Sequence, residues 1–342
     1  TQSFTAINGD EYGIGAGHWR QTVATGNARR NVYFDAFWRP LLTEEYDESS
    51  RGVTQRYQRF AYDEAGRQVF ASHPGESAVL STGTWTGYDA LGRQTSVSVD
   101  SEAGLLTSLT SYLAGGGLKV VDPKGNTTLT TFQAFGAPST ESPVSIIHPA
   151  GAFTDIDRDI FGKPRSIVRR NQDGSARIAR NYVYDGHQQL CKSVEPETGA
   201  TLMGYDAAGN LAWSAAGLDL SSTTACDADA GPVAARRIVR GYDARNRLST
   251  LAFPDGNGNQ GWTYTRDGKP ATVTTANDAG TTQAINTYTY NKRGLLTAET
   301  SSDSTLGIQS LGYAYNANGA LSGLTYPSGR FVDYAPNALG QP

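Results

Sequence analysis

The amino-acid sequence predicts an all-β protein, built as a repeat array of antiparallel β-hairpins. Three observations predict this class. A short motif that begins with Tyr-Asp or Tyr-Asn recurs along the chain, aromatic residues lie two positions apart before many of its copies, and patterns typical of amphipathic helices are almost absent. Together these features predict many short strands joined by tight turns.

The recurring motif is Tyr-Asp-x-x-Gly, in which Asn replaces Asp in the last two clear copies. Well-matched copies lie about 25 residues apart, a period typical of stacked units rather than of one folded core. The motif residues that we assign to the array are Tyr62, Asp63 and Gly66; Tyr88, Asp89 and Gly92; Tyr205, Asp206 and Gly209; Tyr242 and Asp243; Tyr290 and Gly294; and Tyr315 and Gly319.

Each motif position has a local physical reason. An Asp or Asn side chain can accept a hydrogen bond from the backbone two residues later and so begin a tight turn. Glycine follows three positions later because hairpin loops often end with a residue at positive φ, which glycine adopts at little cost. The preceding tyrosines, such as Tyr288 and Tyr290, share one face of a strand and are expected to stack across strands as an aromatic ladder.

The chain organisation follows from where the motif is present. Residues 1–31 match it poorly and are expected to be a degenerate repeat or leading strands, whereas residues 32–342 form the array. The polar stretch 216–233 interrupts the alternation and is expected to be an exposed loop insertion. The chain begins at Thr1 and stops just after a turn motif, so we expect the array to be truncated at both ends.

Composition excludes several classes. With 342 residues the chain exceeds what one compact core usually covers, which favours a repeat array. The net charge is −4, from 29 basic and 33 acidic residues, so bulk charge does not attract nucleic acid. No apolar run reaches the length of a membrane-spanning helix.

The two cysteines, Cys191 and Cys226, are compatible with a disulfide in an oxidising compartment, although sequence does not give their geometry.

The motif copies at Tyr62, Tyr88, Tyr205 and Tyr242, with Pro-x-Gly turns between hairpins, resemble the RHS or YD-repeat family over residues 32–342. This family includes bacterial RHS effectors, the C component of insecticidal toxin complexes and teneurin-like proteins. The resemblance implies a β-sheet that coils into the wall of a hollow shell around another polypeptide, such as a C-terminal toxin. It implies a secreted or cell-surface bacterial protein whose partner is an enclosed toxin or the rest of its own longer chain.

For the motif residues we expect structural roles, with no catalytic, metal-binding or cofactor-binding residue among them and no cofactor. One Asp per turn falls short of the six to eight oxygens of a calcium site. Two alternatives stay open. The tyrosine ladder is compatible with a carbohydrate-binding or adhesion surface, and the cluster of Tyr12, His18, Trp19 and Arg20 is compatible with a polysaccharide-degrading enzyme that uses Tyr or His as base.

Overall fold

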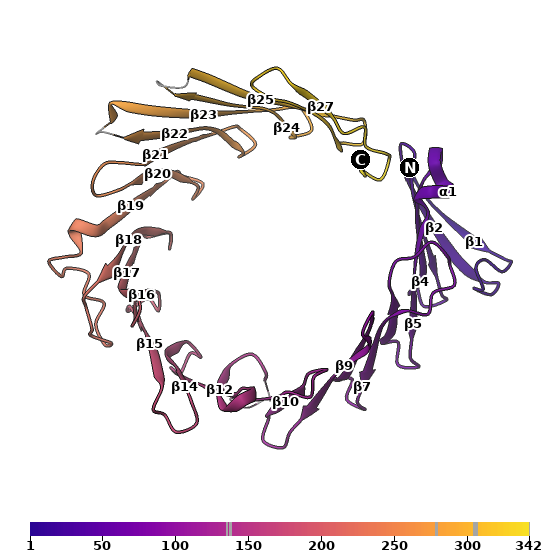
Figure 1. Cartoon of the computed structure of the whole chain (residues 1–342), viewed down its shortest axis with the longest axis horizontal. Coiled ribbons are helices and arrows are strands. Elements are labelled where there is room, and N and C mark those ends of the chain that lie inside the picture. Colours follow the sequence, from indigo (N-terminus) through magenta and orange to yellow (C-terminus); the bar gives the residue numbers. More distant parts are fainter. Residues whose placement is uncertain (135, 137–138, 278–279, 304–306, 342) are drawn as a thin grey trace. The chain divides into compact units, whose positions relative to one another are not determined.

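A computed structural model describes residues 1–134, 136, 139–277, 280–303 and 307–341. Among these residues 27 strands belong to one sheet, and the strand pairings are antiparallel (Figure 1). The all-β prediction is therefore confirmed. The helical segments in the described part are short: η1 (Glu48–Ser50), α1 (Arg51–Thr54), η2 (Pro149–Gly151) and η3 (Ala234–Arg236). Within the described residues, no helix is long and apolar enough to span a membrane.

The chain divides into two compact units. The first comprises Thr1–Leu129, Tyr315–Gly323 and Asp333–Pro342, and the second comprises Thr130–Ala314 and Leu324–Val332. The strands that lie wholly in the first unit are β1 (Gln2–Ile7), β2 (His18–Thr25), β3 (Ala28–Phe34), β4 (Pro40–Asp47), β5 (Arg56–Tyr62), β6 (Gln68–Ser72), β7 (Gly83–Tyr88), β8 (Gln94–Ser101), β9 (Gly104–Tyr112) and β10 (Leu118–Val121).

The second unit continues the same hairpin pattern. Its strands are β12 (Pro143–Ile147), β13 (Phe153–Arg158), β14 (Pro164–Arg170), β15 (Arg177–Tyr184), β16 (Leu190–Glu195), β17 (Gly199–Tyr205), β18 (Leu211–Leu218), β19 (Arg237–Tyr242), β20 (Leu248–Ala252), β21 (Asn259–Tyr264), β22 (Pro270–Asn277), β23 (Thr282–Tyr290) and β24 (Leu296–Asp303). Four strands contain residues of both units: β11 (Thr127–Phe132), β25 (Gly307–Tyr315), β26 (Leu321–Thr325) and β27 (Phe331–Asp333).

The pairing register breaks at the motif tyrosine. In the β7–β8 hairpin, Gly87 pairs with Ser96, but Tyr88 pairs with Gln94, so one residue of β8 is skipped. The same shift occurs at four other motif tyrosines: Tyr62, Tyr205, Tyr242 and Tyr290. A bulge of this kind increases the local twist of the strand pair, so the motif shapes the sheet as well as turning the chain.

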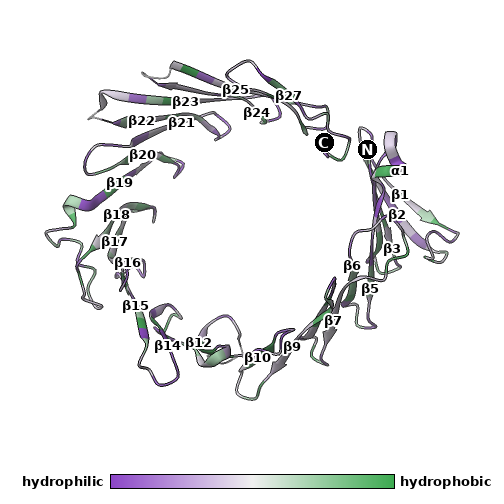
Figure 2. Cartoon of the chain, in the orientation of Figure 1, coloured by the Kyte–Doolittle hydropathy of each residue, from purple (hydrophilic) through white to green (hydrophobic). Residues whose placement is uncertain are grey.

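Apolar burial is distributed along the chain. Figure 2 shows hydrophobic and hydrophilic residues interspersed in short stretches along the strands. The described residues contain two clusters of buried apolar side chains, one in each unit: Ile14, Tyr33, Leu42 and Tyr57 in the first, and Ala200, Leu202, Ala215, Leu218 and Val233 in the second. Stability is therefore expected to come mainly from contacts between neighbouring strands, as in other repeat proteins.

Candidate functional site

The candidate site is the series of tyrosine turns, which we define as the Tyr-Asp-x-x-Gly segments together with the residue that follows each. In the turn at Asp206, the carboxylate oxygen Oδ1 accepts the backbone N–H groups of Ala208 and Asn210, each at 2.9 Å. The Gly209 N–H donates to the Asp206 carbonyl at 3.0 Å. One side chain thus satisfies two amides of the turn, which explains why Asp or Asn begins it.

The other carboxylate oxygen holds the side chain of the fourth residue after the aspartate. Arg67 Nε donates to Asp63 Oδ2 at 2.7 Å, and Arg247 Nε donates to Asp243 Oδ2 at 2.8 Å. Hydrogen bonds from the Arg247 side chain and backbone lower the pKa of Asp243 to about 2. The pKa values of Asp63, Asp89 and Asp206 are lowered for the same kind of reason, so these carboxylates are firmly ionised at neutral pH.

The fourth turn position after Tyr has a left-handed backbone. The φ values are +81° at Gly66, +80° at Gly92, +82° at Gly209, +75° at Gly294 and +87° at Gly319. The backbone keeps this conformation where glycine is absent, with φ of +62° at Trp38, +63° at Gln188 and +58° at Asn246. Pattern matching on glycine alone misses these three turns, whose conformation the surrounding hairpin imposes.

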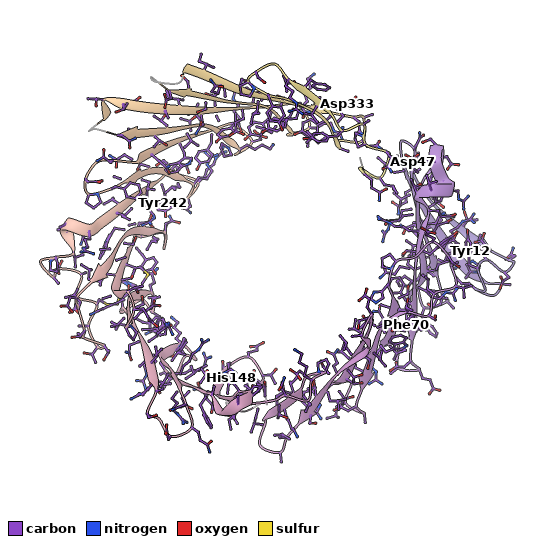
Figure 3. All side chains as sticks on the ribbon, in the orientation of Figure 1. Tyr12, Asp47, Phe70, His148, Tyr242 and Asp333 are labelled. Atoms are coloured by element: carbon purple, nitrogen blue, oxygen red, sulfur yellow. A yellow bond between two sulfur atoms is a disulfide. The ribbon has the colours of Figure 1, made fainter. Side chains whose placement is uncertain are left out.

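Five of the motif tyrosines bond back to the preceding hairpin through their hydroxyl groups. Tyr88 Oη donates to the carbonyl of Gln68, the first residue of β6, at 3.0 Å. Four other motif tyrosines make the equivalent bond: Tyr62 to Pro40, Tyr205 to Leu190, Tyr242 to Leu211 and Tyr290 to Pro270, at 2.9–3.1 Å. Figure 3 labels Tyr242, which ends β19. Tyr315 ends β25, and its turn closes with the Gly319 N–H on the Asn316 carbonyl at 3.0 Å.

Several of the tyrosine rings lie against the cationic end of a basic side chain. The guanidinium of Arg67 lies 4.9 Å from the centroid of the Tyr88 ring, and that of Arg39 lies 4.8 Å from the Tyr62 ring. Further pairs of this kind are Arg93 with Tyr112, Lys163 with Tyr184, Arg247 with Tyr264 and Lys269 with Tyr290. For Tyr62, Tyr88 and Tyr290 the printed ring contact is with a basic residue of the preceding turn, and the ring-on-ring ladder stays a prediction. In each of these pairs, the basic residue that ends one turn lies over the tyrosine of the next turn.

The stretch 216–233 differs from the exposed loop expected from sequence. Residues 216–218 belong to β18, and Val233 is buried in the second unit's apolar cluster. A disulfide joins Cys226 to Cys191 on β16, and Asp227 Oδ2 accepts a hydrogen bond at 2.5 Å from Nζ of the fully buried Lys192. Residues 221–225 do remain exposed. Two adjacent cross-links therefore hold this insertion against the sheet.

The structure gathers three of the four residues that kept an enzyme alternative open. Tyr12 Oη lies 3.3 Å from Glu44 Oε1, while His18 and Arg20 both contact the Glu11 carboxylate. Trp19 points to the other face of β2 and stacks on Trp38 with centroids 5.4 Å apart. Sequence reasoning missed Glu11 and Glu44, because neither belongs to a recognisable motif. In the described residues, no three His, Cys, Asp or Glu side chains are grouped as metal ligands.

The linked turns identify this chain as an all-β protein built from repeated hairpins. No family model and no curated protein sequence matches the chain. Among solved structures, it is similar to a chain of the Photorhabdus luminescens Tc holotoxin pore that carries a TccC3 mutation, with a TM-score of 0.49 and 12% identity. That match covers 95% of this chain and 21% of the other.

Two further similar structures also contain TccC3. The chain is similar to TcdB2-TccC3-TEV with a TM-score of 0.35 and 11% identity, covering 91% of this chain and 23% of that one. For TcdB2-TccC3 the TM-score is 0.30 and the identity is 12%, and the match covers 95% of this chain and 24% of that one. The chain thus spans less than a quarter of the length of the chains that it matches. At such low identity, this likeness concerns the fold alone.

Proposed function

We propose that this chain is a structural wall segment that encloses, shields or presents another polypeptide, such as the C-terminal toxin of a bacterial secreted effector. The observation that carries the proposal is the linkage between successive hairpins. Each linked tyrosine turn contacts the hairpin before it through a hydroxyl-to-carbonyl bond, and a basic residue of that earlier hairpin commonly lies over the tyrosine ring. Repeated links of this kind stiffen a sheet without requiring one central core.

In this proposal the motif residues have structural roles and the wall has no reaction of its own. The ionised aspartates are committed to turn amides, and the tyrosine hydroxyls are committed to backbone carbonyls. The same commitment weakens the glycan alternative for the ladder, because these rings lie against basic side chains instead of forming a flat free row.

Secretion is supported by the cysteine chemistry. The Cys191–Cys226 disulfide joins positions 35 residues apart and leaves no free cysteine in the described chain. Disulfides persist in secreted and periplasmic proteins and are rare in the reducing cytosol. The partner that we propose is therefore an enclosed toxin, or the remainder of a longer secreted chain.

The proposal is tested on the full natural protein that contains this chain, by an electron cryomicroscopy map together with limited proteolysis. Polypeptide density inside the wall, and resistance of that polypeptide to protease until the wall is unfolded, are the expected results. An open sheet with no enclosed density, or an associated polypeptide digested as fast as it is when free, would overturn the wall role.

A further inference from the structure

Both cysteines of the chain lie in the second unit, where they cross-link the 216–233 insertion to the sheet. Cys191 belongs to β16, and Cys226 follows 35 residues later in the insertion. Figure 3 draws the bond between the two sulfur atoms in yellow. The next residue of each segment forms an ion pair, because Lys192 Nζ donates to Asp227 Oδ2 at 2.5 Å. A covalent and an ionic link therefore join the same two segments at adjacent positions.

The register of β15 and β16 explains why two successive residues of a strand reach the same segment. Val183 pairs with Lys192 and Tyr184 pairs with Leu190, so Cys191 is skipped in the pairing. In a regular strand, successive side chains point to opposite faces. At a bulge, two residues of one strand oppose a single residue of the other, which changes the direction of a side chain. The bulge thus allows Cys191 and Lys192 to contact the insertion together.

The centre of the insertion, residues 221–229, has few other contacts with the sheet. Among the described residues the insertion contains no strand after Leu218, and residues 221–225 are exposed. The Ala228 carbonyl accepts a hydrogen bond from Arg237 at 3.2 Å. Towards the two ends of the insertion, three residues pack in or against the apolar cluster of the second unit: Leu220, Ala230 and Val233. The centre therefore depends mainly on the disulfide and the ion pair.

The ion pair by itself contributes little to holding the insertion on the sheet. Lys192 is fully buried, whereas Asp227 is 25% exposed. Taking an ammonium out of water costs about as much free energy as a buried ion pair returns. When the insertion leaves the sheet, the Lys192 ammonium becomes hydrated, and this gain opposes the loss of its partner. The disulfide is thus the contact that keeps the ammonium buried.

The two sulfur atoms differ in their access to solvent. Cys191 is 5% exposed, whereas Cys226 is half-buried and follows the exposed residues 221–225. A small thiolate therefore attacks Cys226, which forms a mixed disulfide there and releases Cys191 as a thiolate. A second small thiolate attacks the outer sulfur of the mixed disulfide and releases Cys226. The small thiols supply two electrons and become their own disulfide, and both protein thiolates take up protons from water.

We propose that the Cys191–Cys226 disulfide is a redox-sensitive latch, closed in an oxidising compartment and opened by a low-molecular-weight thiol. When it opens, residues 221–229 leave the sheet and Lys192 becomes accessible to solvent. The sheet itself stays folded, because the pairings of β17, β18 and β19 do not use the insertion. The chain has two cysteines, so oxidation within one chain restores the same bond. This proposal is independent of the wall role.

The test compares the oxidised 342-residue chain with the same chain in a glutathione buffer of cytosolic poise. Titration is expected to find both thiols free, with the β-sheet circular dichroism unchanged. Hydrogen exchange of residues 226–230 should accelerate at least about tenfold, because the turn that bonds the Ala230 N–H to the Asp227 carbonyl is no longer held. Exchange in β23 and β24 is the control and should change less than about twofold. A disulfide that stays oxidised, unchanged exchange at 226–230, or loss of the sheet signal would each overturn the latch.

Amine labelling distinguishes the uncovering of Lys192 from a general loosening. Acetylation of Lys192 should become at least about tenfold faster on reduction, whereas acetylation of the exposed Lys292 should not change. Lys192→Met removes the ammonium whose hydration favours release, so reduction should accelerate exchange of residues 226–230 less than about threefold in this variant. Unchanged labelling of Lys192, or the same acceleration in Lys192→Met as in wild type, would overturn the proposal.

The double variant Cys191→Ala, Cys226→Ala supplies the matched control for the reagent. It should show the fast exchange of residues 226–230 in both buffers, because the latch is absent. Slow exchange in this variant, or exchange that still responds to glutathione, would overturn the proposal. If the double variant does not fold, the comparison of oxidised and reduced wild type decides by itself.

Discussion

The guanidinium of Arg67 connects two hairpins: it binds Asp63 of its own turn, lies 4.9 Å from the centroid of the Tyr88 ring, and donates from Nη1 to the Asp89 carbonyl at 2.9 Å. Tyr88 in turn donates its hydroxyl to the Gln68 carbonyl, immediately after Arg67. Successive turns are thus joined by reciprocal contacts, and the two residues are expected to stabilise the array as a unit.

A double-mutant cycle on Arg67 and Tyr88 measures this coupling. Tyr88→Phe removes one hydrogen bond and is expected to cost about 0.5–1.5 kcal/mol in urea unfolding, and Arg67→Met about 1–2 kcal/mol. The double variant should lose at least about 0.5 kcal/mol less than the sum, because both changes break the same junction. Arg165→Met is the control, since its pair with Asp157 is exposed and should be worth under about 0.5 kcal/mol. If the stability losses of the two single variants simply add in the double variant, Arg67 and Tyr88 do not stabilise the junction as a unit.

Gly209→Val tests the left-handed turn position. The Cβ would meet only the Gln189 side chain at 3.5 Å, so space is available, but φ is +82°. A β-branched residue in this conformation is expected to cost about 1–3 kcal/mol of stability while leaving any binding by the folded chain unchanged. Gly186→Val, at an open turn position without positive φ, is the control. Equal melting temperatures for the Gly209 variant and wild type, combined with lost binding, would show that the glycine has a functional role instead.

Gln188→Gly tests whether a residue other than glycine is strained at the left-handed turn position. Gln188 holds φ at +63° without being glycine, and the position is exposed. Relief of strain should exceed the added entropy of the unfolded chain, giving a net gain of about 0.5 kcal/mol in thermal unfolding. The control, Gln172→Gly, lies in an exposed turn without positive φ and should lower stability slightly. A loss at both positions would show that the turn at Gln188 is not strained.

Acid should weaken the tyrosine turns. The folded-state pKa of Asp243 is about 2, below the ordinary value of 3.8, so its ionised form stabilises the fold above about pH 4 and that contribution is lost as the pH falls towards 2. Asp243→Asn should therefore lower the melting temperature at pH 7 and make little difference at pH 2. Asp157→Asn, at an exposed ion pair, is the control and should have a small effect at both values. A gap between wild type and Asp243→Asn that stays constant from pH 7 to pH 2 would exclude a role for the charge.

The ion pair of Lys192 and Asp227 should respond asymmetrically to mutation. Lys192 is fully buried, whereas Asp227 is 25% exposed. Asp227→Ala leaves a buried ammonium without a partner and is expected to cost about 3–5 kcal/mol. Lys192→Met removes the buried charge and leaves a partly solvated carboxylate, so the cost should be about 1 kcal/mol. Thermal unfolding with the disulfide intact compares the two, and equal losses would mean that burial of the ammonium does not govern the stability of this pair.

The sequence determined the features that arise from contacts between near neighbours in the chain. Asp206, Gly209 and Asn210 interact within five residues, so the same turn recurs wherever the same letters recur, and the all-β class and the hairpin order follow from it. Two expectations stay predictions. The first is that the sheet closes into a shell, and the second is that the chain divides into residues 1–31, residues 32–342 and the 216–233 insertion.

The tertiary structure decided the contacts whose partners have no fixed spacing. Glu44 is surrounded by groups from residues 31, 33, 51 and 55, which meet only because strand register and α1 bring them together. The Cys191–Cys226 bond and the burial of Val233 depend likewise on how an insertion folds back on the sheet. The contact of Arg67 with the Tyr88 ring was decided there as well, because the two residues belong to successive hairpins. Local hydrogen bonds can be predicted from sequence periodicity, whereas packing between distant segments depends on the folded geometry.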